Sequence, residues 1–131
     1  MKDKVTSIQQ SRRLLELGVP ADKASMSWVK DPNESEYSLC VHDECCYEVA
    51  ALEPVPAFTV VDLLKMLPAV ITYGRIHITR STYSKGEDWR VFYKRVGVSK
   101  GCIVSFGDCT LIQPVCDMIE WLLSNGYRSK L

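Results

Sequence analysis

Hydrophobic positions recur with a helical period in two stretches that also carry helix-terminal signals. The stretches cover residues 59–67 and 110–125, and both are almost wholly apolar on one face. Each opens on a threonine, Thr59 or Thr110, with Asp or Gln three residues later, which is the spacing of a capping box. A proline or a glycine then stops each pattern. The two stretches therefore predict scaffold helices laid on a core.

A third helix is predicted near the N-terminus. Thr6 or Ser7 caps it, because both have glutamine three residues later, and its apolar stripe runs to about Leu17. Gly18 then ends the helix, since glycine readily adopts the left-handed conformation found after a last helical turn. A short helical turn over residues 21–27 is expected to follow.

Alternation of apolar and polar residues, typical of half-buried strands, marks the other ordered segments. The alternating segments are residues 37–41, 46–51, 76–79, 89–94 and 102–106. A short polar link joins the first two, which predicts a hairpin, and Pro54 and Pro56 predict an extended linker after it. Because the other loops are also short, the pattern predicts an α+β fold with a mostly antiparallel sheet of about five strands and three main helices packed on one face.

The length of 131 residues fits one globular domain over residues 1–131. Its longest nearly apolar run, residues 57–71, is interrupted by two charged residues, so no membrane span is predicted. The N-terminus, residues 1–4, is followed by polar residues, so no signal peptide is predicted either, and a cytoplasmic location is expected. Among six cysteines, Cys116 lies in a predicted helix and Cys102 beside apolar residues. A thiol in such places behaves as a small hydrophobe, so we expect reduced, free cysteines.

The net charge is zero, but the charges are unevenly placed. Residues 31–53 hold seven acids and no lysine or arginine: Asp31, Glu34, Glu36, Asp43, Glu44, Glu48 and Glu53. Residues 69–101 hold, against Glu87 and Asp88, seven bases: Arg75, Arg80, Lys85, Arg90, Lys94, Arg95 and Lys100. Opposite charges on neighbouring strands stabilise their pairing, so the main interpretation is that the two blocks offset each other across the sheet. The alternative is a basic binding face.

One cluster contains residue types that bind metals. Cys40 and His42 share a face of a predicted strand, and Cys45 or Cys46 returning across the hairpin would complete three soft ligands. Structural zinc sites usually present two cysteine pairs, and a second pair is missing from this sequence. No local motif marks a nucleophile with its base, and no glycine-rich phosphate loop is present. The sequence therefore predicts neither an enzyme nor a cofactor, and the cysteines are expected to be free of metal.

Nucleic-acid binding is the alternative function. Basic and aromatic residues share one face of two neighbouring predicted strands: Arg75, His77 and Thr79, then Arg90, Phe92 and Lys94, with Tyr83 nearby. Such a face is typical of sheets that bind nucleic-acid strands. The candidate contacts are Arg75, Arg80, Arg90 and Lys94. The net charge of zero and the lack of a recognition-helix pattern argue against this function.

Four blocks of sequence carry a resemblance to a set of known proteins. The blocks are residues 11–20 (SRRLLELGVP), residues 24–26 with Trp28, residues 56–59 with Leu63, Leu64, Leu67 and Pro68, and residues 118–127 (MIEWLLSNGY). In this order they resemble small uncharacterised proteins encoded in phages and mobile elements of gut Bacteroidales. No activity is attached to that set, so no residue inherits a role from it. The resemblance implies an accessory, horizontally carried gene product.

The main functional interpretation is a small, non-enzymatic interaction protein, an accessory or inhibitor factor that binds a host or element-encoded protein. A nucleic-acid-binding accessory protein that uses the basic strands over residues 75–95 is the alternative. Salt separates the two, because nucleic-acid affinity falls steeply as counterions are added, whereas a protein partner held by apolar contacts shows no such slope.

Overall fold

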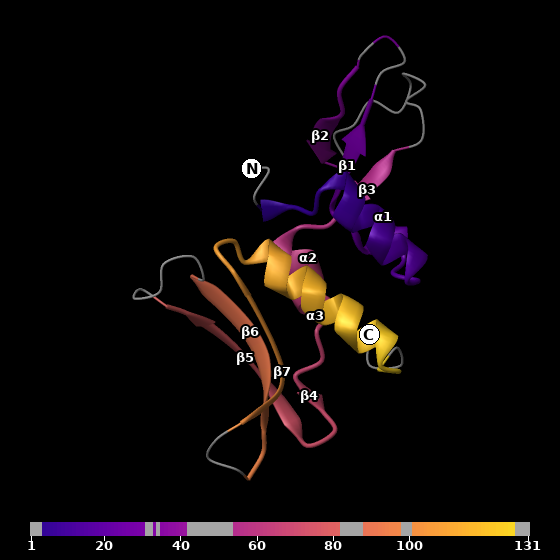
Figure 1. The fold of residues 1–131 in the computed structure, drawn as a ribbon. Coiled ribbons are helices and arrows are strands. Elements are labelled where there is room, and N and C mark those ends of the chain that lie inside the picture. The colour runs from indigo at the N-terminus through magenta and orange to yellow at the C-terminus, as the bar shows by residue number, and fades with distance from the viewer. Residues whose placement is uncertain are drawn as a thin grey trace. The chain divides into compact units, whose positions relative to one another are not determined.

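The computed structural model describes residues 4–30, 33, 35–41, 54–81, 88–97 and 101–127. The chain forms two compact units, residues 1–62 and 63–131, and each contains an antiparallel sheet (Figure 1). The α+β class is confirmed. The prediction of one sheet of about five strands is wrong, because the described strands form a sheet of three and a sheet of four. A single domain over residues 1–131 stays a prediction.

The first unit joins a helix to a three-stranded sheet whose order is β2-β1-β3. Its elements are α1 (Ile8–Glu16), the 3-10 turn η2 (Ala21–Lys23), β1 (Met26–Val29), β2 (Ser38–Val41) and β3 (Val55–Ala57). Helix α1 packs against β3. The predicted helix is confirmed, since it is capped by Ser7, whose side chain accepts from the Gln10 N–H while the Gln10 side chain accepts from the Ser7 N–H.

Two strands of this sheet differ from the predictions. The helical turn ends at Lys23 instead of Ser27, and the chain continues as β1, the central strand. The expected proline linker is β3, in which Pro56 lies opposite Ser27. Proline has no N–H to donate and is tolerated on an edge strand, so its presence hid a strand from the sequence pattern. The described strand β2 pairs with β1, and the predicted hairpin partner, residues 46–51, lies outside the described residues.

Thr6 is the buried junction of the first unit. Its N–H donates to the carbonyl of Phe58 at 2.8 Å, and its hydroxyl accepts from the Phe58 N–H at 3.0 Å. Its carbonyl accepts from the indole N–H of Trp28 at 2.9 Å, and its hydroxyl lies 2.6 Å from that of Ser11. Since unpaired polar groups are costly when buried, these bonds hold the N-terminal segment, α1, β1 and the end of β3 together.

Helix α2 (Val60–Met66) begins with the predicted capping box. The Thr59 hydroxyl accepts from the Asp62 N–H at 3.1 Å, and the Asp62 carboxylate accepts from the Thr59 N–H at 2.9 Å. The N–H and hydroxyl of Ser25 also donate to that carboxylate. Burial by itself would raise the pKa of Asp62, but the bonds from Ser25 and Thr59 together lower it. The predicted stop before Pro68 is confirmed.

Replacing Thr59 with alanine is expected to lower the free energy of unfolding by about 1 kcal/mol, because an N–H in the first turn of α2 loses its acceptor. Urea melts of the wild type and the variant measure the change. Thr110→Ala is the control, because Thr110 caps no helix in the structure, and it should cost clearly less. Equal losses in the two variants would contradict this difference in role.

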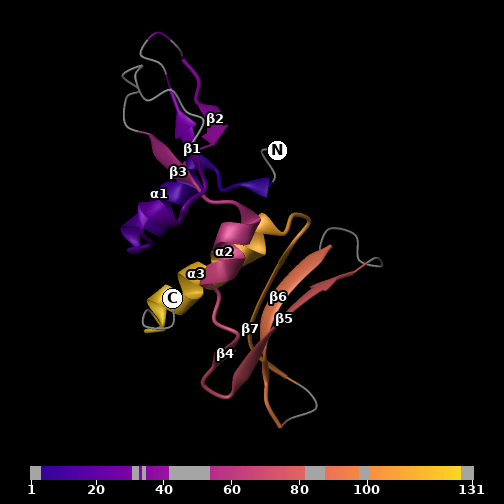
Figure 2. The ribbon, with the colours of Figure 1, turned by 180° about the vertical axis from the view of Figure 1, so that it is seen from behind.

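The second unit is a four-stranded sheet with one long helix. Its elements are β4 (Val70–Ile71), β5 (Gly74–Arg80), β6 (Trp89–Arg95), β7 (Cys102–Asp108) and α3 (Ile112–Ser124). The strands follow one another in the order β4-β5-β6-β7, and α3 packs on β6 and β7 (Figure 1 and Figure 2). The prediction that three helices pack on one face of one sheet is therefore wrong, because α1 packs on the other sheet.

The predicted cap of α3 is wrong at its start and confirmed at its end. The helix begins at Ile112, and Thr110 donates its N–H and hydroxyl to Asp108 at 3.2 and 2.9 Å instead of capping. Asp108 therefore binds the Thr110 groups that a capping box at the start of α3 would use. At the other end Gly126 has a φ of +84°, and the Tyr127 N–H donates to the Leu122 carbonyl at 2.9 Å.

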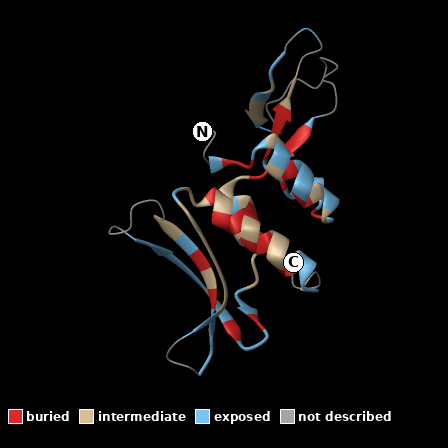
Figure 3. Ribbon diagram, viewed as in Figure 1, coloured by how far each residue is buried: buried red, intermediate tan, exposed pale blue. Residues whose placement is uncertain are grey.

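The core of the second unit lies between α3 and the sheet. Val91 and Tyr93 of β6 are fully buried (Figure 3). On α3 the fully buried residues are Val115, Met118, Ile119 and Leu122. Trp121, which shares the apolar pattern of this helix, is only half-buried and stacks on Tyr127 at a centroid distance of 5.8 Å. The apolar pattern of α3 by itself would place Trp121 in the core, but the structure leaves this side chain half-exposed.

Candidate nucleic-acid interface

One side of the second sheet carries basic and aromatic side chains. Because residues alternate along a strand, the buried Val91 and Tyr93 place their neighbours on the opposite side, away from α3. We call that side the basic face. It consists of Arg75, His77 and Thr79 of β5, Arg90, Phe92 and Lys94 of β6, and Ser105 of β7. The prediction that the first six of these residues share a face is confirmed by the register.

An aromatic pair lies at the centre of the basic face. His77 and Phe92 are directly opposite each other on β5 and β6, and their rings stack with centroids 5.3 Å apart and planes at 12°. The Arg90 guanidinium lies 5.8 Å from the centroid of Phe92 and donates through Nε to the Ser105 hydroxyl at 2.6 Å. The contribution of Ser105 has no signal in the sequence, because it depends on β7 pairing with β6. These contacts hold the Arg90 cation beside Phe92, one of the two stacked rings.

Two basic side chains lie directly opposite each other at one end of this face. Arg75 pairs with Lys94 in the register, and both are exposed. Like charges in this position destabilise the pairing of strands. Among the described residues, neither Arg75 nor Lys94 forms an ion pair, whereas Arg13 and Glu16 on α1 do. An anion bound between Arg75 and Lys94 would relieve their repulsion.

Arg80, the fourth candidate contact, does not belong to the basic face. It lies opposite Trp89, and its position alternates with those of Arg75, His77 and Thr79. Its guanidinium lies 5.3 Å from the centroid of the Trp89 ring. This cation–π contact gives Arg80 a packing role on the opposite side of β5. The structure therefore brings together three of the four predicted contacts.

Among the described residues, the acidic block does not meet the basic block across neighbouring strands. The partners of β5 are β4 and β6, and those of β6 are β5 and β7, whereas Glu36 precedes β2 in the other sheet. The interpretation that acids of residues 31–53 offset the bases across one sheet is therefore wrong for Glu36. The remaining acids of that block lie outside the described residues. Asp108, whose pKa is lowered by the bonds from Thr110, lies opposite Trp89 and so on the other side from the basic face.

The metal candidate is only partly described. His42, Cys45 and Cys46 lie outside the described residues, and Cys40 is disulfide-bonded. The expectation of free cysteines is therefore wrong at Cys40, whereas the described Cys102, Cys109 and Cys116 are free. That expectation came from the apolar settings of Cys102 and Cys116, which carry no information about a cysteine on β2. Across the described ranges, no three His, Cys, Asp or Glu side chains gather as metal ligands would.

The chain matches no protein-family model, no curated protein sequence and no solved structure. Function is therefore argued from the basic face and from the residues around it. Among the described helices, none has both the length and the apolar character to cross a membrane.

Proposed function

We propose that this protein is a non-enzymatic accessory protein that binds single-stranded nucleic acid on the basic face. The observation that carries the proposal is the pairing of Arg75 with Lys94 beside the stacked rings of His77 and Phe92. The role as an accessory factor of a phage or mobile element follows the resemblance and is part of the proposal. A protein partner remains the competing interpretation.

The spacing of the side chains favours a single strand as the ligand. Outward residues on one strand repeat about every 6.6–6.8 Å, so Lys94 and Arg90 lie roughly 13 Å apart with Phe92 between them. An unpaired strand offers phosphates to the two cations and a base to the rings between them. Base–aromatic stacking contributes about 1–3 kcal/mol per base in such sites. A duplex keeps its bases stacked inside, so it would reach the cations but not the rings.

Salt dependence is the test of this proposal. We expect a fluorescent oligonucleotide to bind with a slope of about −2 when the logarithm of its binding constant is plotted against the logarithm of the salt concentration. Each phosphate contact to a single strand contributes about −0.7 to this slope, and three basic side chains of the face, Arg75, Arg90 and Lys94, can each contact a phosphate. The measurement is fluorescence anisotropy with a single-stranded and a duplex probe, and the single strand should bind more tightly. An affinity that does not change with salt would overturn the proposal and favour a protein partner.

Matched variants locate the binding on this face. Lys94→Gln should make the salt slope shallower by about 0.7, and Phe92→Leu should weaken binding about fivefold or more while leaving the slope unchanged, because it removes stacking but no charge. Arg12→Gln, an exposed change on α1, is the control for net charge. If Arg12→Gln alters the slope as much as Lys94→Gln does, binding is general charge attraction and not a property of the basic face.

A further inference from the structure

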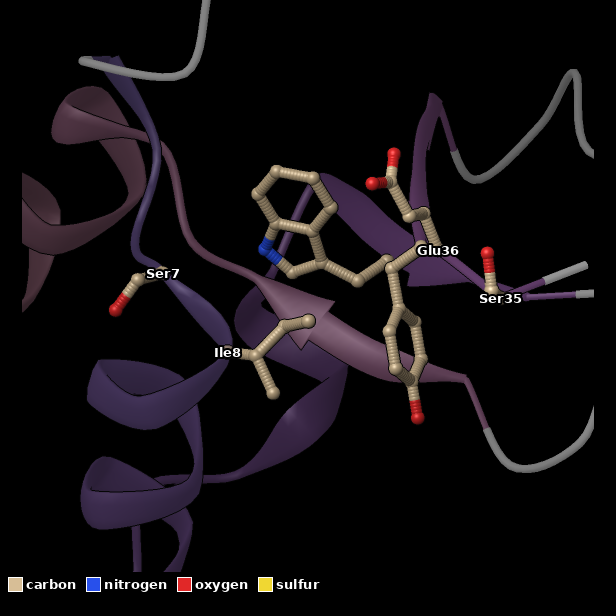
Figure 4. A pocket seen from close by; sticks show the side chains of 6 residues that line it. Ser7, Ile8, Ser35 and Glu36 are labelled. Atoms are coloured by element: carbon tan, nitrogen blue, oxygen red, sulfur yellow. The ribbon is translucent and has the colours of Figure 1, made fainter.

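A second candidate site lies in the first unit and is independent of the basic face. It is a pocket of about 390 Å³, within the size range of ligand sites. Its lining residues are Ser7, Ile8, Trp28, Ser35, Glu36 and Tyr37 (Figure 4). Ile8 lies on one side of the pocket, and Ser35 and Glu36 lie on the other (Figure 4). Ile8 and Tyr37 pack against the core cluster that contains Trp28, so the wall that they form is anchored to the core.

The pocket combines aromatic surface with one carboxylate. The indole N–H of Trp28 already donates to the Thr6 carbonyl, so Trp28 offers the pocket its ring and not a donor. The Tyr37 ring already attracts one cation, since Lys30 Nζ lies 5.8 Å from its centroid. Glu36 is exposed and is the one ionisable carboxylate among the lining residues. Aromatic rings beside a carboxylate favour a positively charged group on an apolar stem.

Charge complementarity points to the same kind of ligand. Because Glu36 lines the pocket, a negatively charged ligand would be repelled there, whereas the side chain of a basic peptide would be attracted. We infer that this pocket binds the lysine or arginine side chain of a partner peptide, with the alkyl stem against Ile8 and the charged end beside Trp28 and Glu36.

The test uses the whole protein and an acetylated, amidated Ala-Lys-Ala tripeptide. The readout is the indole N–H signal of Trp28 in nitrogen-15 NMR spectra, assigned by its loss in Trp28→Phe. We expect this signal to shift on titration with the lysine peptide. The matching peptide with norleucine in place of lysine, which keeps the stem and lacks the charge, should bind about fivefold more weakly or not at all. Equal binding of the two peptides, or an unmoved Trp28 signal, would overturn the inference.

Two further variants test the charge preference of the pocket, one that removes a negative charge and one that removes a positive charge, and a third serves as the control. Glu36→Gln should remove the preference for lysine over norleucine, because it removes the carboxylate and keeps the size of the side chain. Glu16→Gln, on exposed α1 in the same unit, is the matched control and should keep the preference. Lys30→Gln removes a competing positive charge and should tighten binding of the lysine peptide; weaker binding would contradict the inference. A preference that survives Glu36→Gln would also overturn it.

Discussion

Replacing Trp28 with alanine is expected to lower the free energy of unfolding by about 3–5 kcal/mol. Trp28 is 8% exposed and packs in the core cluster with Val5, Met26, Val55 and Ala57. The change removes the largest side chain of that cluster and also leaves the Thr6 carbonyl without the indole N–H that donates to it. Urea or thermal melts measure the loss.

Trp121→Ala is the matched control for this prediction. Trp121 is half-buried, and its described aromatic contact is the stack on Tyr127. An aromatic pair of this kind contributes about 0.5–1.5 kcal/mol, so its loss should cost clearly less than the loss of Trp28. If Trp121→Ala destabilised the protein as much as Trp28→Ala, the assignment of the two tryptophans to core and periphery would be wrong.

Stability is expected to fall steeply as the pH rises from about 9 to about 12. Burial raises the pKa of Tyr93 from 10.0 to about 12, and its hydroxyl donates to the Pro68 carbonyl at 2.7 Å. Burial, with the nearby charges of Asp117 and Glu120, raises the pKa of the Cys116 thiol from 9.0 to about 12. Over this range the unfolded chain loses both protons while the folded chain keeps them. The stability that these two groups contribute is therefore fully present below their pKa values in the unfolded chain. It is lost as the pH rises toward their pKa values in the folded chain.

The expected contribution of Tyr93 alone is about 2–3 kcal/mol, because each pKa unit corresponds to about 1.4 kcal/mol. Urea midpoints measured across this pH range test it. Tyr93→Phe should be less stable near neutral pH, since the Pro68 carbonyl loses its donor, and should show a shallower alkaline loss. Tyr73→Phe is the control, because Tyr73 is 81% exposed. A Tyr93→Phe profile as steep as that of the wild type would mean that this hydroxyl does not cause the loss.

The start of a helix could be predicted from the capping-box spacing where no nearby carboxylate binds the capping threonine. Thr59 and Thr110 have the same spacing to a polar residue, but only Thr59 caps its helix. Thr110 follows Asp108 by two residues, and that carboxylate takes both of its donors. The difference is local, and an aspartate two residues before a threonine is the signal that identifies it.

Strand pairing was harder to predict than strand positions. The period of two placed six of the seven residues of the basic face, those on β5 and β6, on one side, which the register confirms. It gave no information on which strands would be neighbours, so the charge blocks were matched across one sheet although β2 belongs to the other. The strands missed were β1, β3 and β4, which have two to four residues each, too few for alternation to be recognised. The pocket lined by Glu36 could not be predicted from the sequence, because its wall includes Trp28 of β1, a strand that the sequence pattern did not predict.

The bonds of Thr6 also set the order in which the first unit can assemble during synthesis. The residue bonds to Ser11, Trp28 and Phe58, at sequence separations of 5, 22 and 52. The partners of the first two bonds leave the ribosome early, but the bonds to Phe58 wait until nearly the whole unit has emerged. Contacts of such long separation are slow to form because the loop must first close. The N-terminal segment therefore stays incompletely paired on the ribosome until β3 and Phe58 have emerged, and this unit is expected to complete its folding only once nearly all of its own residues have been released.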